Sequence, residues 1–158
     1  MRLKTPIVEI RNLKIGGESR VAIQAMTDTD TEDATATAKQ CILLANAGAE
    51  LVRITVNTEK AAEKVSEIRK ILDKKGYKSL PIIGDFHFNG HILLSKYPKC
   101  ASTLDKYRIN PGNIGHGKFH DENFKKIIRI AVKNNKPIRI GVNCGSLDQD
   151  LLSDMMNK

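Results

Sequence analysis

Short apolar runs recur about every 25 to 30 residues along the chain, and the segments between them show helical periodicity. The runs cover residues 21–26, 51–56, 81–87, 106–110 and 137–143. Between them, apolar side chains fall on one helical face, as Val65, Ile68 and Leu72 do. Parallel strands cannot be joined by a tight turn, so this alternation with short connections predicts right-handed parallel βαβ units.

The expected helices carry start and stop signals. Thr31 is a candidate N-cap for the acidic segment that follows it, and Gly48 stands where a left-handed C-terminal residue is expected. Thr58 and Gly76 bracket the next helix in the same way. Ser146 stands three residues before Gln149, which is the spacing of a capping box at the start of a final helical segment.

Ahead of the first strand, the pair Gly16-Gly17 separates two alternating segments and predicts the turn of a small antiparallel hairpin. The five βα units that follow are fewer than the eight of a closed barrel. The same number would complete a doubly wound sheet. The polar positions on the strands are therefore needed to choose between the two folds.

Each of the last four strands carries polar side chains two residues apart, which places them on a common face of the strand. These positions are Arg53, Thr55 and Asn57; Asp85 and His87; Arg108 and Asn110; and Arg139, Gly141 and Asn143. In a doubly wound sheet helices cover both faces, so these arginines would be buried without partners. The sequence therefore predicts an α/β fold that is a partial TIM (β/α)8 barrel, with its first five βα units preceded by a β-hairpin.

Three of these inward positions are arginines, whereas only one, Asp85, is a carboxylate. An unpaired buried charge costs about 3 to 5 kcal/mol, so the excess of positive charge points to a bound anion. A diphosphate matches that charge, and the planar guanidinium fork suits phosphate oxygens. Gly112 and Gly115 follow one of the arginine strands and predict a loop whose backbone N–H groups approach the same ligand.

Composition narrows the possible partners. A net charge of +8 over 158 residues suits an anionic ligand, but three Tyr, four Phe and no Trp leave few platforms for stacking nucleic acid bases. The three cysteines form no C-x-x-C pair, so neither a disulfide framework nor a zinc site is indicated. The chain also has no signal-peptide pattern and no apolar run of about eighteen residues, so we expect a cytoplasmic protein without a membrane span.

Two further groups lie near the expected strand ends. Asp85 and His87 stand side by side and are candidates for moving a proton or holding a hydroxyl group, although they could also simply orient the arginines. Cys144 follows the last strand but has no nearby general base, so an inert residue is favoured over a nucleophile.

Five segments occur in a characteristic order: "QAMTDTDTEDATAT", "GAELVRITV", "DFHF", "RINPGNIG" and "PIRIGVNCGSLDQDLL". With these motifs the chain resembles the 4-hydroxy-3-methylbut-2-enyl diphosphate synthase family from about Pro6 onward. The resemblance implies a barrel that binds 2-C-methyl-D-erythritol 2,4-cyclodiphosphate at its C-terminal mouth. It also implies a two-electron reductive ring opening with loss of water, on the methylerythritol phosphate route to isoprenoids.

The resemblance further implies a 4Fe-4S cluster held by three Cys and one Glu in a separate C-terminal domain, flavodoxin or ferredoxin as electron donor, and a homodimer. Carried over by motif, the substrate-binding residues are Arg53, Arg108, Asn110, Arg139, Asn143 and Ser146, and the residues facing the reacting carbons are Asp85 and His87. None of the cysteines matches a cluster ligand, so no metal site is expected in this chain.

Residues 1–158 correspond to the N-terminal part of such a barrel, without its last three strands and without the iron–sulfur domain. We therefore expect that this chain alone does not turn over substrate. We also expect it to form dimers or larger species, because its two open sheet edges invite pairing with another copy. Two other functions remain open at this point: a diphosphate-binding barrel of the dihydropteroate synthase type, and a non-catalytic basic scaffold that binds polyanions.

Overall fold

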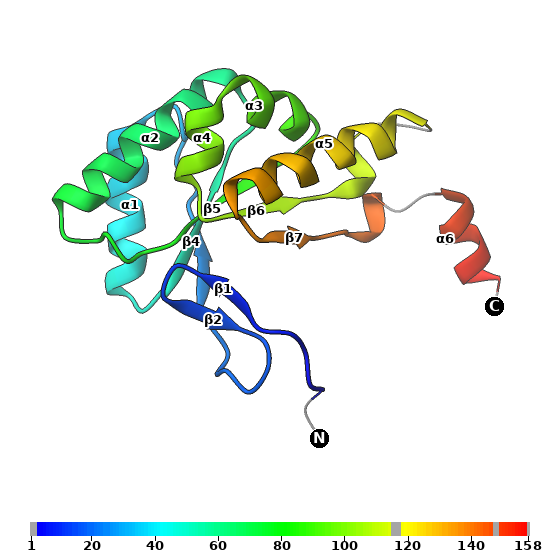
Figure 1. The fold of residues 1–158 in the computed structure, drawn as a ribbon, viewed down its shortest axis with the longest axis horizontal. Helices are drawn as coiled ribbons and strands as arrows, with labels where there is room; N and C mark the ends of the chain where they lie inside the picture. Colours follow the sequence, from blue (N-terminus) through cyan, green and yellow to red (C-terminus); the bar gives the residue numbers. More distant parts are fainter. Residues whose placement is uncertain (1–2, 115–117, 147–148, 158) are drawn as a thin grey trace.

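The computed structural model describes residues 3–114, 118–146 and 149–157, which form a sheet covered by helices and a separate small hairpin (Figure 1). The hairpin consists of β1 (Val8–Ile10) and β2 (Leu13–Ile15). The sheet contains β3 (Gln24–Met26), β4 (Leu51–Thr55), β5 (Ile82–Phe86), β6 (Lys106–Ile109) and β7 (Ile138–Ile140). The α-helices are α1 (Ala34–Asn46), α2 (Glu59–Lys74), α3 (Gly90–Lys96), α4 (Pro98–Thr103), α5 (Lys118–Asn134) and α6 (Gln149–Met156).

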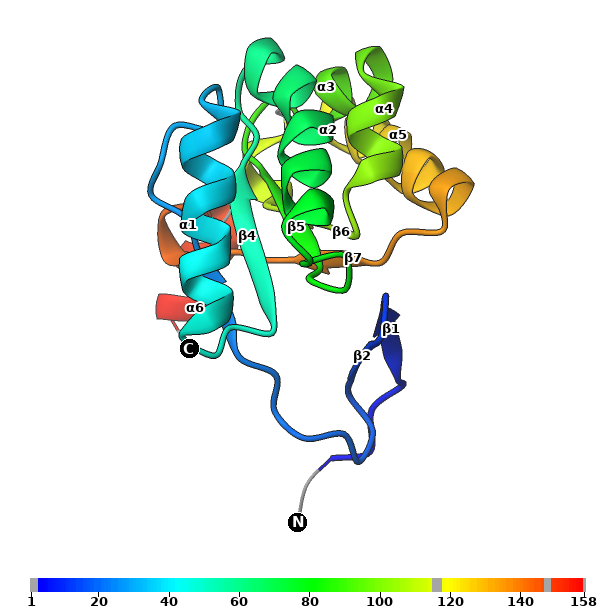
Figure 2. The same ribbon diagram turned by 90° about the vertical axis from the view of Figure 1, so that its left-hand side faces the viewer.

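The five strands of the large sheet are all parallel and follow one another in the order β3-β4-β5-β6-β7. A doubly wound sheet would instead reverse its strand order at a switch point. Helices α1 to α5 all lie on one face of the sheet, and none of these five helices covers the other face (Figures 1 and 2). This arrangement is that of a partial barrel, so the predicted fold class is confirmed.

The main hydrophobic core lies between the sheet and the helices. Phe86 and Tyr107, both fully buried on neighbouring strands, meet edge to face with ring centroids 5.9 Å apart. The helical periodicity correctly predicted the buried side of α2, since Val65, Ile68 and Leu72 have no exposed surface. None of the described helices combines the length and the apolar character needed to span a membrane.

The opposite face of the sheet, which we call the inner face, has an apolar layer at its N-terminal end. Leu51 and Ile83 pack there against Ile10 of the hairpin, and each is about 1% exposed. The hairpin therefore covers the lower end of the inner face. The polar side chains discussed below lie further toward the carboxyl ends of the strands.

Two of the predicted element ends were wrong. The hairpin turns at Arg11, which has a φ of 54°, and not at Gly16-Gly17, because the side chain of Arg11 donates to Asp105 (2.6 Å) and to the carbonyl of Lys78 (2.8 Å). The N-cap of α1 is Asp33, whose carboxylate accepts from the N–H of Ala36 (2.9 Å).

The helix ends predicted at Thr58, Gly48 and Gly76 were correct, whereas the predicted cap at Ser146 stays a prediction, because residues 147–148, just before α6, lie outside the described residues. Thr58 caps α2 by accepting from the N–H of Ala61 (3.0 Å). Gly48 and Gly76 both adopt the left-handed backbone that ends a helix.

Candidate functional site

Strand register brings the predicted polar residues into rows on the inner face. Asp85 of β5 is level with Arg108 of β6, which in turn is level with Arg139 of β7. Paired residues of neighbouring parallel strands point to the same side of the sheet, so these three side chains share the inner face. Residues two apart from them, such as His87 and Asn110, extend this polar row toward the carboxyl ends of the strands.

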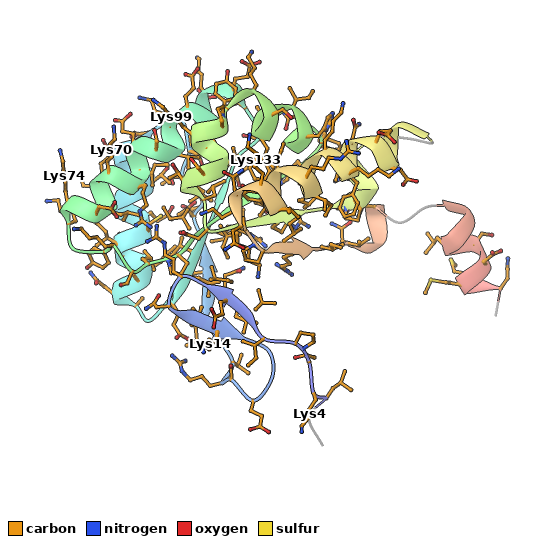
Figure 3. The ribbon with its side chains drawn as sticks, in the orientation of Figure 1. Lys4, Lys14, Lys70, Lys74, Lys99 and Lys133 are labelled. Carbon is orange, nitrogen blue, oxygen red and sulfur yellow. The ribbon has the colours of Figure 1, made fainter. Side chains whose placement is uncertain are left out.

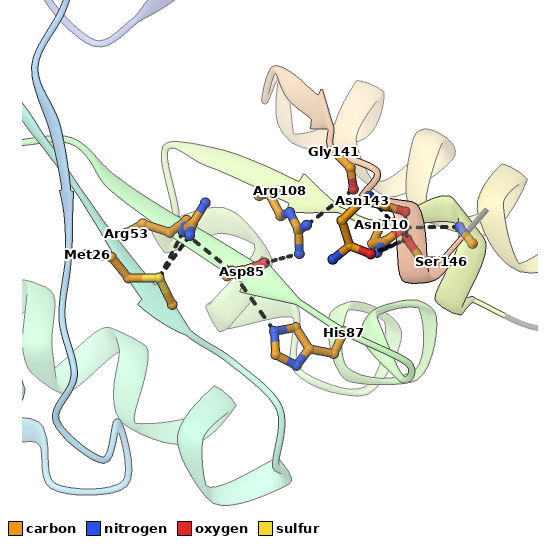
Figure 4. Close-up of polar contacts among 10 residues, drawn as sticks. Met26, Arg53, Asp85, His87, Arg108, Asn110, Gly141, Asn143 and Ser146 are labelled. Atoms are coloured by element: carbon orange, nitrogen blue, oxygen red, sulfur yellow. Dashed lines mark hydrogen bonds and ion pairs between the residues drawn. The ribbon is translucent and has the colours of Figure 1, made fainter.

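Asp85 lies at the centre of this row, with its side chain 3% exposed. Its carboxylate accepts from Arg108 Nη1 at 3.0 Å and lies 3.4 Å from Arg53 Nε (Figure 4). His87 Nε2 lies 4.0 Å from the same carboxylate. One acid is thus shared by two guanidinium groups from the strands on either side of it.

Arg108 retains unused hydrogen-bonding capacity. Its Nη2 donates to the carbonyl of Gly141 (3.2 Å), but its buried Nε has no hydrogen-bond partner among the described residues. A Cβ atom at position 141 would lie 3.1 Å from that Nε, so glycine leaves the guanidinium the room it occupies. Arg139, next along the row, is exposed and forms no ion pair with any residue that the structure describes.

Arg53 has a second contact that the sequence did not suggest. The Sδ atom of Met26, level with it on β3, lies 2.9 Å from Nη2 and 3.2 Å from Nε. A thioether is a weak and uncharged acceptor, so it orients the guanidinium group without neutralising it. Only strand register, which pairs Met26 with Arg53, could have pointed to this contact.

The three remaining predicted site residues form a cluster beyond the strand ends. Asn110 Nδ2 donates to Ser146 Oγ (2.9 Å), and the backbone N–H of Asn143 also donates to that oxygen (3.2 Å). The Ser146 hydroxyl has one proton, which it donates either to the carbonyl of Asn143 (3.0 Å) or to its side-chain oxygen (2.9 Å). The structure therefore brings Asn110, Asn143 and Ser146 together, next to Arg108 and Gly141 (Figure 4).

The glycine loop after β6 does not have the predicted role at Gly112. Its N–H donates to Asn110 Oδ1 (3.2 Å), so it is not free to bind a ligand. A Cβ atom at position 112 would lie 1.9 Å from the carbonyl oxygen of Ser146, which shows why glycine is needed there. Gly115, the other glycine of this prediction, lies outside the described residues.

Replacing Gly112 by Ala should lower the free energy of unfolding by about 1 to 3 kcal/mol, because the new methyl group must displace the backbone of Ser146. Urea denaturation measures the change. Gly145→Ala is the matched control, since its Cβ atom would meet nothing closer than Asn143 Oδ1 at 3.8 Å. Equal losses of unfolding free energy in the two variants would contradict the close approach of Gly112 to the backbone of Ser146.

The described residues offer no group of three or more His, Cys, Asp or Glu side chains that could hold a metal ion. Cys41 and Cys100 are buried as free thiols, and burial raises the pKa of Cys41 to about 11 and that of Cys100 to about 12. A cluster ligand must be a thiolate, so these residues do not fit an iron–sulfur cluster. The side chain of Cys144 lies outside the described residues.

The chain also matches a known family over nearly its whole length. The family model of the GcpE TIM-barrel domain matches residues 5–158. The chain belongs to the GcpE TIM-barrel domain family. Enzymes of the GcpE family are oxidoreductases of the methylerythritol phosphate pathway to isoprenoids and generally depend on an iron–sulfur cluster. The resemblance to 4-hydroxy-3-methylbut-2-enyl diphosphate synthase that the motifs indicated agrees with this GcpE match.

Proposed function

We propose that the inner face of this GcpE domain binds a diphosphate, that of 2-C-methyl-D-erythritol 2,4-cyclodiphosphate. The observation that carries the proposal is the charge balance around Asp85. This single carboxylate is shared by Arg53 and Arg108, and Arg139 beside them has no acidic partner among the described residues. A bound diphosphate would supply the missing negative charge, and guanidinium groups bind phosphate oxygens in pairs.

Each predicted site residue then has a distinct role. Arg53, Arg108 and Arg139 bind the phosphate oxygens, and the unpartnered Nε of Arg108 is available to one of them. The cluster of Asn110, Asn143 and Ser146 lies at the edge of the site and supports the same group. Asp85 and His87 face the carbon skeleton, where the imidazole can exchange a proton with a ligand hydroxyl.

The proposal assigns this chain binding rather than the complete reaction. In the family to which the motifs point, the cyclic diphosphate is opened reductively with loss of water, using electrons from flavodoxin or ferredoxin. The cysteines that the structure describes do not fit a cluster, so no electron-transfer step is assigned to these residues. We accordingly expect binding without turnover by residues 1–158, and self-association through the edges of β3 and β7.

Isothermal titration calorimetry at about 50 and 200 mM salt tests the proposed ligand. The cyclic diphosphate should bind with a signal that changes little between the two salt concentrations, because a few partly buried contacts are screened less than surface contacts. Preferential binding of a pterin diphosphate would favour the dihydropteroate synthase type of site. Binding only to heparin, with a steep loss at the higher salt concentration, would indicate a polyanion scaffold and overturn the proposal.

A further inference from the structure

A fourth cationic side chain, that of Lys106, lies on the inner face of the sheet. It was not among the predicted site residues. It is the first residue of β6 and lies two positions before Arg108, so both side chains point to the same side of the sheet. Its level partner on β5 is Ile83, which belongs to the apolar layer covered by the hairpin. Lys106 is therefore directly below the polar row, on the side toward the hairpin.

The surroundings of Lys106 do not compensate its charge. The residue is 9% exposed, and within the described part of the chain its ammonium group has neither an ion-pair partner nor a hydrogen bond. The nearest acid of the polar row, Asp85, already serves two arginines. Burial lowers the pKa of Lys106, and the like charge of Arg139 lowers it further. The guanidinium group of Arg139 is therefore close enough to repel the ammonium group.

A purely structural role does not explain a lysine at this position. A Met or Leu side chain would fill the same space beside Ile83 without the cost of burying a charge that has no partner. The lysines of the outer helices are easily explained, because Lys70, Lys74, Lys99 and Lys133 are exposed there with their ammonium groups in solvent (Figure 3). Lys106 differs from them because it adds a positive charge to the inner face, where the arginines already outnumber the acids.

We propose that Lys106 is a further anion-binding residue, whose ammonium group binds the diphosphate from below while Arg108 and Arg139 bind it from the polar row. This inference rests on the proposed function and extends it to a residue outside the recognised motifs. An ammonium group is a compact point charge with three donors, which complements the flat forks of the arginines. The ligand then provides the negative charge that the folded chain lacks around Lys106.

The proposal predicts opposite effects on stability and on binding. In Lys106→Met the ligand-free protein should melt at a temperature at least as high as that of the unchanged chain, because an uncompensated charge has been removed. The same variant should bind pyrophosphate about ten to a hundred times more weakly, through the loss of a charge-assisted hydrogen bond. Thermal melting and calorimetry with pyrophosphate, both at about 150 mM salt, measure the two effects.

Lys133→Met is the matched control, since it removes the same charge from the exposed side of α5 and should leave pyrophosphate affinity nearly unchanged. Lys106→Gln serves as a second variant, with the same expected loss of affinity. If the unchanged chain binds pyrophosphate and both Lys106 variants bind it equally well, this inference fails alone. If the unchanged chain does not bind pyrophosphate, the proposed function fails as well. Loss of folding in both variants would assign Lys106 to the fold and overturn its role in binding.

Discussion

Replacing Asp105 by Ala should lower the free energy of unfolding by about 3 to 5 kcal/mol. Asp105 precedes β6 and is 6% exposed. Its carboxylate accepts from Arg11 Nε at 2.6 Å and from the backbone N–H of Ile82 at 2.8 Å, and Arg69 Nη1 lies 3.9 Å away. One side chain therefore connects the hairpin, the sheet and helix α2. Without it, the buried N–H of Ile82 and the Nε of Arg11 lose their acceptor, and Arg69 loses a neighbouring negative charge.

Guanidinium chloride denaturation followed by circular dichroism measures the loss. A domain of this size is typically stable by about 5 to 15 kcal/mol, so the variant should unfold at a clearly lower denaturant concentration. Glu9→Ala is the control, because the ion pair of Glu9 with Lys14 in the same hairpin is solvent-exposed and should contribute less than about 1 kcal/mol. A loss below about 1 kcal/mol for Asp105→Ala would show that the carboxylate does not anchor the hairpin.

The features of the fold that could be predicted from sequence are those that depend on local pattern. The spacing of Val65, Ile68 and Leu72 fixes the buried side of α2 wherever the helix packs. The turn of the hairpin could not be predicted in this way. Its position depends on the long-range bonds of Arg11 to Asp105 and Lys78, and no local signal distinguishes Arg11 from other surface arginines.

For the candidate site, the face of each strand on which the polar side chains lie was predictable, because it too depends on local pattern. The two-residue alternation on each strand correctly placed Arg53, Asp85 and Arg108 on one face, because side-chain direction in a strand is a local property. What each side chain binds depends on neighbouring strands. The contact of Met26 with Arg53 and the burial of Lys106 beside Ile83 both follow from strand register, which the pattern within a single strand does not contain.

Replacing Asp85 by Asn should destabilise the ligand-free protein by about 3 kcal/mol and strengthen its binding of pyrophosphate. The carboxylate is the only acid that Arg53 and Arg108 contact among the described residues, so its loss leaves two neighbouring guanidinium groups uncompensated. The cost is at the low end of the usual range because both arginine side chains keep some exposure, 22% and 16% respectively. A diphosphate would no longer compete with a protein carboxylate for the same donors.

Thermal melting with and without pyrophosphate separates the two effects. All variants receive the same pyrophosphate concentration, about a hundred times the dissociation constant of Asp85→Asn, which should return about 2.7 kcal/mol to that variant and less to proteins that bind more weakly. Glu67→Gln, which removes an exposed acid paired with Lys64, should change neither property by much.

The double variant Asp85→Asn, Arg108→Met should be more stable than Asp85→Asn alone, because it removes one of the two charges left unpaired. If pyrophosphate stabilises Asp85→Asn no more than it stabilises Glu67→Gln, then Asp85 does not compete with the ligand. In that case the charge balance on which the proposed function rests does not govern anion binding.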